Sequence, residues 1–239
     1  MSGGERDLSG GALKQIALLT MLTDHLAYGF YGPVFARHGW LDAYSLMRTA
    51  GRLAFPLFCF LLVTGFQKTR SRRRYLLRLT LFALASEIPF DLAFENSVLE
   101  FGYQNVGFTL LLGFLAMGLL ELWEILKMPY RVILSLLTVG GFIMTAHLIS
   151  CDYAEGGVLL IALMYLFRND EKLFPLGVLA GIIWLCVVYS WSELPAVIAL
   201  LLIWRFDGSR GKMKTAVPYI FYPAHLLAIW LLRRLIFGI

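Results

Sequence analysis

Long, nearly uninterrupted stretches of apolar residues are the feature that most constrains this chain. A helix needs about 20 apolar residues to cross the hydrocarbon core of a bilayer, and fewer where neighbouring helices shelter it. The sequence predicts an all-α polytopic integral membrane protein with about nine transmembrane helices, of which the sixth and eighth are short. The nine stretches lie at residues 12–34, 46–67, 74–94, 106–126, 130–150, 154–167, 173–190, 193–206 and 216–237.

The composition excludes the main alternatives to a membrane protein. Apolar residues make up 59% of the 239 residues and charged residues only 15%, whereas globular chains carry about 25% charged residues. A soluble domain of this size could not cover its surface with so little charge. The net charge of +5 could suggest nucleic acid, but the cations are concentrated in alternate loops between the apolar stretches. We therefore expect no nucleic-acid partner.

The distribution of these cations predicts the topology. Cytoplasmic loops of membrane proteins collect Lys and Arg. The cation-rich loops contain Arg70, Arg72, Arg73, Arg74, Arg78, Lys127, Arg131, Arg168, Lys172, Arg205, Arg210, Lys212 and Lys214. The intervening loops instead carry Asp42, Glu95, Glu100, Asp152, Glu155 and Glu193. The pattern indicates a cytoplasmic N-terminus and a C-terminus outside, with Arg233 and Arg234 as the exception.

The remaining features indicate a single membrane domain. Residues 1–11 are rich in Gly and Ser and are expected to form a disordered cytoplasmic tail, and residues 12–239 a single transmembrane domain. The first apolar stretch has no small-residue cleavage site and is expected to stay in the membrane. Cys59, Cys151 and Cys186 lack any metal-ligand spacing. We expect them to be buried small side chains, and we expect no metal site.

Ionisable and polar residues inside the apolar stretches are the main functional signal. A charge at mid-bilayer is costly, so such residues are usually paired and functional. Most come in pairs four residues apart, which places both members on one helical face. With the predicted topology they fall in the outer half of the membrane, where they could meet in one layer. They are Asp24, His25, Arg48, Arg52, Glu87, Asp91, Asn105 and Thr109, with His225 somewhat deeper.

Within this set, His25 is the residue best suited to general-base catalysis, because an imidazole titrates near neutrality. Adjacent helical residues point about 100° apart, so Asp24 and His25 need separate partners. We expect Asp24 to pair with Arg48 or Arg52, which leaves His25 facing a cavity. The alternative is that these residues are helix-packing ion pairs without chemistry. His38 and His147 are expected to be loop and interfacial residues.

The cytoplasmic run from Arg70 to Arg74, followed by Tyr75 and Arg78, has two readings. It could fix the topology and contact anionic lipid, or it could bind a polyanionic cosubstrate such as the phosphates of coenzyme A. No H-E-x-x-H or G-x-S-x-G motif is present, which argues against a zinc protease or a serine hydrolase.

Five segments of the sequence resemble the TraX family of membrane acetyltransferases, named for acetylation of the conjugative F-pilin N-terminus. The resemblance covers most of the chain. CDYAEGG is also similar to an outer-loop element of that family. The five segments are LKQIALLTMLTDH, RTAGRLAFPLFCFLLVTGF, RRYLLRLTLFALASEIPFDLAF, QNVGFTLLLG and YIFYPAHLL.

The resemblance implies acetyl transfer from acetyl-CoA, as cosubstrate, to an amine or hydroxyl at the outer face of the bacterial inner membrane. It implies a catalytic set of His25, Asp24, Arg48, Arg52, Glu87, Asp91 and Asn105. The residues expected to hold the cosubstrate are Arg72, Arg73, Arg74, Tyr75, Arg78, Thr109 and His225. The expected partners are membrane lipid, a cytoplasmic acyl-CoA donor and an outer peptide or glycan acceptor, with a homodimer left open.

In this interpretation His25 is the base, oriented by the network around Asp24. Arg48 and Arg52 hold that network or stabilise the oxyanion, and Asn105 donates to the acyl carbonyl. Direct transfer is expected, and an acetyl-His intermediate stays open. Two other functions are also open: a proton-coupled transporter, in which the carboxylates relay protons, and a non-enzymatic assembly factor for pili or envelope polymers.

Overall fold

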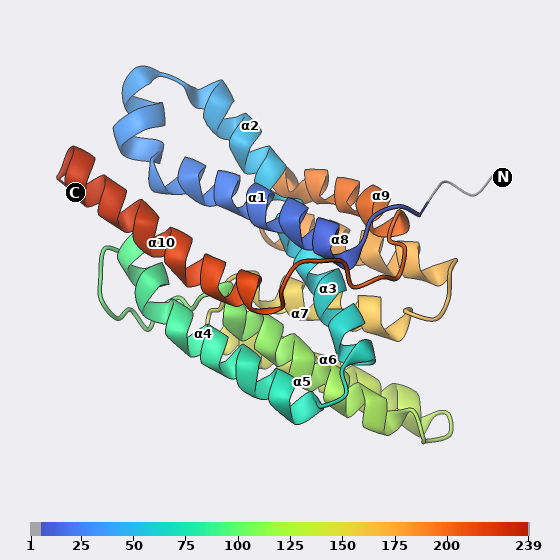
Figure 1. Cartoon of the computed structure of the whole chain (residues 1–239). Helices are drawn as coiled ribbons and strands as arrows, with labels where there is room; N and C mark the ends of the chain where they lie inside the picture. The colour runs from blue at the N-terminus through green and yellow to red at the C-terminus, as the bar shows by residue number, and fades with distance from the viewer. Residues whose placement is uncertain (1–5, 239) are drawn as a thin grey trace. The chain divides into compact units, whose positions relative to one another are not determined.

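A computed structural model of the chain describes residues 6–238. Their regular secondary structure is helical, and they contain no strand (Figure 1). Helices occupy all nine predicted stretches. The stretch 46–67 is two helices separated at Arg52 and Leu53, and the stretch 193–206 begins with a 3-10 turn. The elements are α1 (Gly10–Gly29), the π-helix η1 (Tyr31–Ala36), α2 (Leu41–Gly51), α3 (Ala54–Lys68), α4 (Arg72–Phe94), α5 (Val106–Trp123), α6 (Tyr130–Leu148), α7 (Ala154–Leu166), α8 (Leu173–Val188), η2 (Trp191–Val197), α9 (Ile198–Trp204) and α10 (Ala216–Phe237).

Four helical segments are long and apolar enough to cross a membrane. They are Leu41–Lys68, which combines α2 and α3, and the helices α5, α6 and α10. The apolar helices α7, α8 and η2–α9 are shorter. The all-helical membrane character is thus confirmed, while nine crossings and the sides of the two termini stay predictions.

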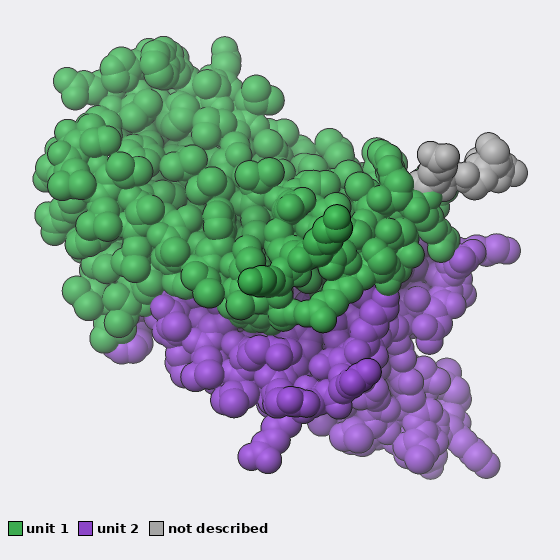
Figure 2. Space-filling model, in the orientation of Figure 1, with its two compact units in different colours: residues 1–61, 88–99, 191–239 green, residues 62–87, 100–190 purple. Residues whose placement is uncertain are grey.

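The chain forms two compact units (Figure 2). Unit 1 contains residues 1–61, 88–99 and 191–239, and unit 2 contains residues 62–87 and 100–190. Helices α3 and α4 each contribute to both units.

In unit 1, α1 packs against α2 and α10, and η2 contacts α2 and α9. Of the tail predicted over residues 1–11, residues 1–5 lie outside the described part of the chain. Leu8 instead joins residues 205–207 through two backbone hydrogen bonds, from its N–H to Arg205 and from the Asp207 N–H to its carbonyl. The Ser9 hydroxyl caps α1 by accepting from the Ala12 N–H (3.2 Å). The described end of the predicted tail is therefore the structured start of α1.

Arg233, an exception to the charge pattern, has a partner at the end of α4 in unit 1. Its Nη1 donates to the carbonyl of Ala93 at 2.6 Å. The last carbonyls of a helix lack intrahelical partners and carry partial negative charge. This hydrogen bond accounts for Arg233 near the predicted outer face, so the predicted number of nine transmembrane helices does not have to change.

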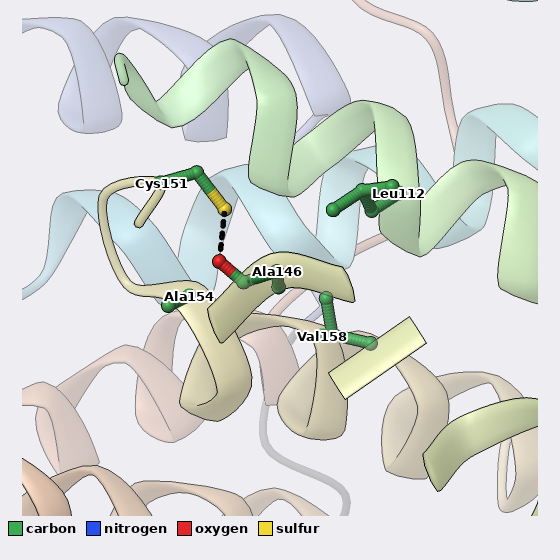
Figure 3. Packing of buried hydrophobic residues seen from close by; sticks show 5 residues of the cluster. All are labelled: Leu112, Ala146, Cys151, Ala154 and Val158. Carbon is green, nitrogen blue, oxygen red and sulfur yellow. Dashed lines mark hydrogen bonds between the residues drawn. The ribbon is translucent and has the colours of Figure 1, made fainter. Parts of the chain in front are cut away.

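In unit 2, α5 to α8 pack against one another around small side chains. One buried cluster consists of Leu112, Ala146, Cys151, Ala154 and Val158 (Figure 3). The Cys151 thiol lies 3.6 Å from the Ala146 carbonyl. Cys59, Cys151 and Cys186 are all buried and form no disulfide, and no cluster of metal-ligating side chains occurs between residues 6 and 238. The cysteines are therefore small core side chains, as predicted.

Glycine allows the closest helix approach within unit 2. A Cβ added to Gly107 on α5 would lie 2.8 Å from the Cα of Ala83 on α4. Because that neighbour is backbone, it cannot rotate away. Gly118, on the same helix, would meet nothing within 4 Å.

We predict that Gly107→Ala destabilises the protein by about 1–3 kcal/mol, because the added methyl group pushes α4 and α5 apart. Gly118→Ala is the matched control and should cause no loss, since alanine favours a helix. Unfolding of the two variants in mixed detergent micelles measures both changes. Equal stability of the two variants would show that the α4–α5 approach is not tight.

Candidate active site

Four charged side chains form a continuous chain of ion pairs in unit 1. Asp24 on α1 accepts from Nη1 of Arg48 (2.6 Å) and from Nη2 of Arg52 (3.5 Å). Arg52 also donates through Nη1 to Glu193 of η2 at 2.5 Å. The side chains of Arg52 and Glu193 are only 10% and 7% exposed. Two cations and two carboxylates alternate, so the buried charges balance.

The backbone around Gly51 makes this arrangement possible. Helix α2 ends at Gly51 and α3 begins at Ala54, so Arg52 lies in the break between them. A Cβ on Gly51 would lie 2.6 Å from the Asp24 carboxyl carbon. Only a residue without a side chain lets α2 approach α1 closely enough for Asp24 to reach both arginines. The predicted pairing of Asp24 with Arg48 or Arg52 is therefore present, with both arginines.

His25, the next residue on α1, pairs with His225 on α10. Its Nδ1 lies 2.7 Å from Nε2 of His225, and the two rings are stacked at an interplanar angle of 12°. Phe94 and Tyr222 pack edge-on against the His25 ring. The sequence interpretation had Asp24 orient His25 and left the imidazole facing a cavity. In the structure, His225 holds the imidazole.

The hydrogen bonds of His225 set the neutral tautomers of the pair. Its Nδ1 lies 2.9 Å from the Phe221 carbonyl, which can only accept, so Nδ1 carries a proton. In the neutral ring Nε2 is then an acceptor, and His25 must donate to it through Nδ1. The lone pair of His25 is consequently on Nε2. No side chain or carbonyl within residues 6–238 hydrogen-bonds to that nitrogen.

Of the other predicted polar residues, Asn105 and Glu87 contact each other within unit 2. The Asn105 amide donates through Nδ2 to the Ala83 carbonyl (2.8 Å) and to Glu87, while its Oδ1 caps α5 by accepting from the Gly107 N–H. Both Nδ2 hydrogens are thus engaged. The predicted donation from Asn105 to an acyl carbonyl needs one of these bonds to open, and it stays a prediction.

Thr109 and Asp91 are both buried. Thr109 donates to the backbone carbonyl of Asp152 and lies 3.1 Å from the Cys151 thiol, in unit 2. Asp91 is fully buried on the part of α4 that belongs to unit 1, one turn beyond Glu87. Asp24, His25, Arg48, Arg52, Asp91 and His225 thus belong to unit 1, and Glu87, Asn105 and Thr109 to unit 2. Their predicted meeting in one layer is untested.

Sequence reasoning missed Glu193 as a partner of Arg52 and placed it in an outer loop. Glu193 is 5% exposed. One signal was available, because this carboxylate stands at the very start of an apolar stretch, where a charge needs a partner. The His25–His225 pair was also missed. Two hundred residues separate the two histidines, and no spacing rule links them.

The comparison with protein families places the sequence in a known group. The family model described as TraX protein matches residues 9–233, which include Asp24, His25, Glu193 and His225. The chain belongs to the TraX family. Among curated proteins, the "Probable fimbrial assembly protein FimC, serogroup H1" of Dichelobacter nodosus is 29% identical over 244 residues, covering 92% of this chain and 93% of that protein. No solved structure matches the chain.

In this TraX-family protein, the predicted cosubstrate cluster of unit 2 is partly engaged in internal contacts. Arg72 pairs with Glu121 at 2.8 Å, and its guanidinium lies 3.8 Å from the centroid of the Phe66 ring. Arg78 lies over the Tyr75 ring at 5.3 Å. Arg73 and Arg74 are exposed. The exposed arginines can meet a phosphate directly, whereas Arg72 would first have to leave Glu121.

We predict that Arg52→Met destabilises the TraX-family fold by about 3 kcal/mol or more, because it leaves Glu193 buried without its cation. The double variant Arg52→Met, Glu193→Leu removes one charge of each sign and leaves the Arg48–Asp24 pair. It should recover much of the lost stability. Unfolding in detergent supplies the double-mutant cycle, and a double variant as unstable as the sum of the two single variants would argue against the pairing.

Proposed function

We propose that this TraX-family protein is an acetyl-CoA-dependent acetyltransferase of the bacterial cytoplasmic membrane. Its acceptor is an amine at the outer face, with the N-terminus of a pilin-like peptide as the preferred substrate class. The observation that carries the proposal is the half-buried imidazole of His25, whose Nδ1 is fixed by His225 and whose Nε2 keeps a lone pair. A base held in this way is what proton removal from an attacking amine requires.

The relatives support an envelope role. The Dichelobacter nodosus protein is named for fimbrial assembly, and the TraX family takes its name from acetylation of a pilin N-terminus. Both concern polymers of small subunits exported across the cytoplasmic membrane. A peptide amine therefore suits the acceptor better than a glycan hydroxyl.

The chemistry is a direct acyl transfer. The amine nitrogen attacks the thioester carbonyl carbon and forms a C–N bond, while His25 Nε2 takes a proton from the nitrogen. The C–S bond then breaks, and its electron pair leaves with the coenzyme A sulfur. The proton held by His25 passes to that thiolate, and the imidazole returns to its starting tautomer. Atoms and charges balance without any further reactant.

The charged network has two roles in this scheme. Asp24, Arg52 and Glu193 fix α1 against the α2–α3 break and η2, and so hold the segment that carries His25. Arg48 is the more exposed cation, with a side chain that is 26% exposed. It is the network's best group for contact with the oxygen of the tetrahedral intermediate.

The proposed topology brings the two substrates from opposite sides. With nine crossings and a cytoplasmic N-terminus, the cationic loops face the pool of acetyl-CoA and the acidic loops face the exported acceptor. The acidic outer loops also attract a cationic peptide N-terminus.

We predict that His25→Ala lowers acetyl transfer by about 10²–10⁴-fold, the usual contribution of a positioned base. Purified full-length protein, labelled acetyl-CoA and a pilin-derived peptide provide the assay, and thermal stability in detergent checks folding. His147→Ala is the matched control, because this histidine has a 68% exposed side chain, and it should retain activity. Undiminished transfer by a folded His25→Ala variant would remove His25 from the mechanism.

The name of the Dichelobacter nodosus relative favours one second candidate, a non-enzymatic assembly factor. That function predicts pilus assembly that needs the protein but not His25. Complementation of a deletion strain with His25→Ala separates the two functions. Subunits that wild type acetylates and that His25→Ala leaves unmodified indicate the enzyme. Pili restored by His25→Ala, with no acetylation by wild type, indicate the assembly factor.

A further inference from the structure

A second group of cations lies in unit 1, where α1 begins. The loop before α10 crosses the first residues of α1: Gly10 donates its N–H to the Ser209 carbonyl at 2.9 Å. A Cβ on Gly11 would lie 3.2 Å from the backbone nitrogen of Lys212. This close crossing fixes the loop cations beside the first turn of α1. We name as the α1 basic cluster the four residues Lys14, Arg210, Lys212 and Lys214.

The α1 basic cluster is not neutralised from within. Between residues 6 and 238 no carboxylate forms an ion pair with any of its four members. Arg210 donates to the Thr215 hydroxyl at 2.6 Å and acts electrostatically on Lys14, which is half-buried. Like charges repel each other, and an anion bound between Lys14 and Arg210 would reduce that repulsion.

Two acidic residues near the α1 basic cluster in unit 1, Asp7 and Asp207, have partners outside the cluster. Arg205 donates through Nε to Asp7 at 2.9 Å, and that hydrogen bond lowers the pKa of the Asp7 carboxyl. Asp207 accepts from the Ser209 N–H at 2.7 Å. These two acids are thus directed to other partners and form no ion pair with the α1 basic cluster.

Lys14, the one member of the α1 basic cluster that lies on α1, and the catalytic candidate His25 share one face of that helix. Lys14 and His25 are eleven positions apart on α1. At 1.5 Å and 100° per residue, they are separated by about 16 Å along the axis and by only about 20° around it. Leu18 and Met21 occupy the same face between them and are buried. A ligand that touches both ends must therefore be a polyanion on an arm of about 16 Å.

The structure assigns to the α1 basic cluster the phosphates of acyl-CoA, with α1 setting the distance to the reacting thioester. This rests on the acetyl transfer proposed above. In coenzyme A, thirteen bonds separate the pantetheine phosphate from the sulfur, which is also about 16 Å when extended. The phosphates supply the negative charge that four unpaired cations require. Leu18 and Met21 are buried between the two ends, so binding of the arm requires these side chains to move aside, and methionine is flexible enough to do so.

This assignment differs from the arginine run predicted in the sequence. That run belongs to unit 2, and its Arg72 is held by Glu121. The α1 basic cluster belongs to the same unit as His25, and its member Lys14 shares a helix face with His25. The phosphate contacts of the cosubstrate therefore come chiefly from Lys14, Arg210, Lys212 and Lys214.

Acetyl-CoA binding to the full-length protein in nanodiscs of neutral lipid tests the assignment. Arg210→Gln and Lys212→Gln should each weaken binding about tenfold, and the weakening should shrink at high salt. Lys172→Gln, an exposed cation of another loop, is the matched control and should bind as wild type does. Acetyl-pantetheine, which lacks the phosphates, should act as an equally poor acetyl donor for wild type and all variants.

Each outcome supports or overturns the assignment. Equal acetyl-CoA binding by wild type, Arg210→Gln and Lys212→Gln would overturn it. A similar loss with acetyl-pantetheine would also overturn it, since the phosphates would not be involved. Phosphate-dependent binding without acetyl transfer by wild type would retain this site and refute the proposed function. Acetyl transfer from acetyl-CoA that is equal in wild type, Arg210→Gln and Lys212→Gln would refute this site and retain the proposed function.

Discussion

The cost of placing charge in a medium of low dielectric constant governs the arrangement of unit 1. Asp24 stands in the middle of an apolar helix, where an isolated carboxylate would be strongly unfavourable. Arg48 and Arg52 compensate it, and Arg52 in turn requires Glu193. Each charge recruits the next, so three chain segments that are distant in sequence become fixed to one another. The absence of a side chain at Gly51 is the local condition that allows this.

The same helix connects this network to the histidine pair. Because Asp24 and His25 point in different directions, α1 is fixed on one side by ion pairs and on another by the hydrogen bond to His225 on α10. The Phe221 carbonyl then determines which nitrogen of each ring carries a proton. The chemistry proposed for His25 follows from backbone and side-chain contacts within unit 1. Lys14, on the same face of α1, lies about 16 Å from His25 along the helix axis.

Much of this was predictable from the sequence, because it depends on local patterns. Apolar stretches bounded by charged loops predicted the helical regions, although not the break between α2 and α3. The pairing of Asp24 with Arg48 or Arg52 was also predicted, and the structure has both. The N-cap formed by Asn105 could also have been predicted, because an Asn directly before an apolar stretch is a common helix N-cap. The rotation of each helix about its axis is set by packing with distant segments. The Arg52–Glu193 and His25–His225 contacts depend on that rotation, so they could not be derived from spacing.

The central claim is that His225 holds His25 in the tautomer whose free lone pair lies on Nε2. Nitrogen-15 NMR of full-length protein labelled at histidine measures this directly, because protonated and unprotonated ring nitrogens have well-separated chemical shifts. Comparison with His25→Ala and His225→Ala assigns the signals. The account predicts that both rings are protonated at Nδ1, with Nε2 unprotonated in His25 and coupled across the hydrogen bond in His225. A His25 ring protonated at Nε2, or one unaffected by loss of His225, would contradict it.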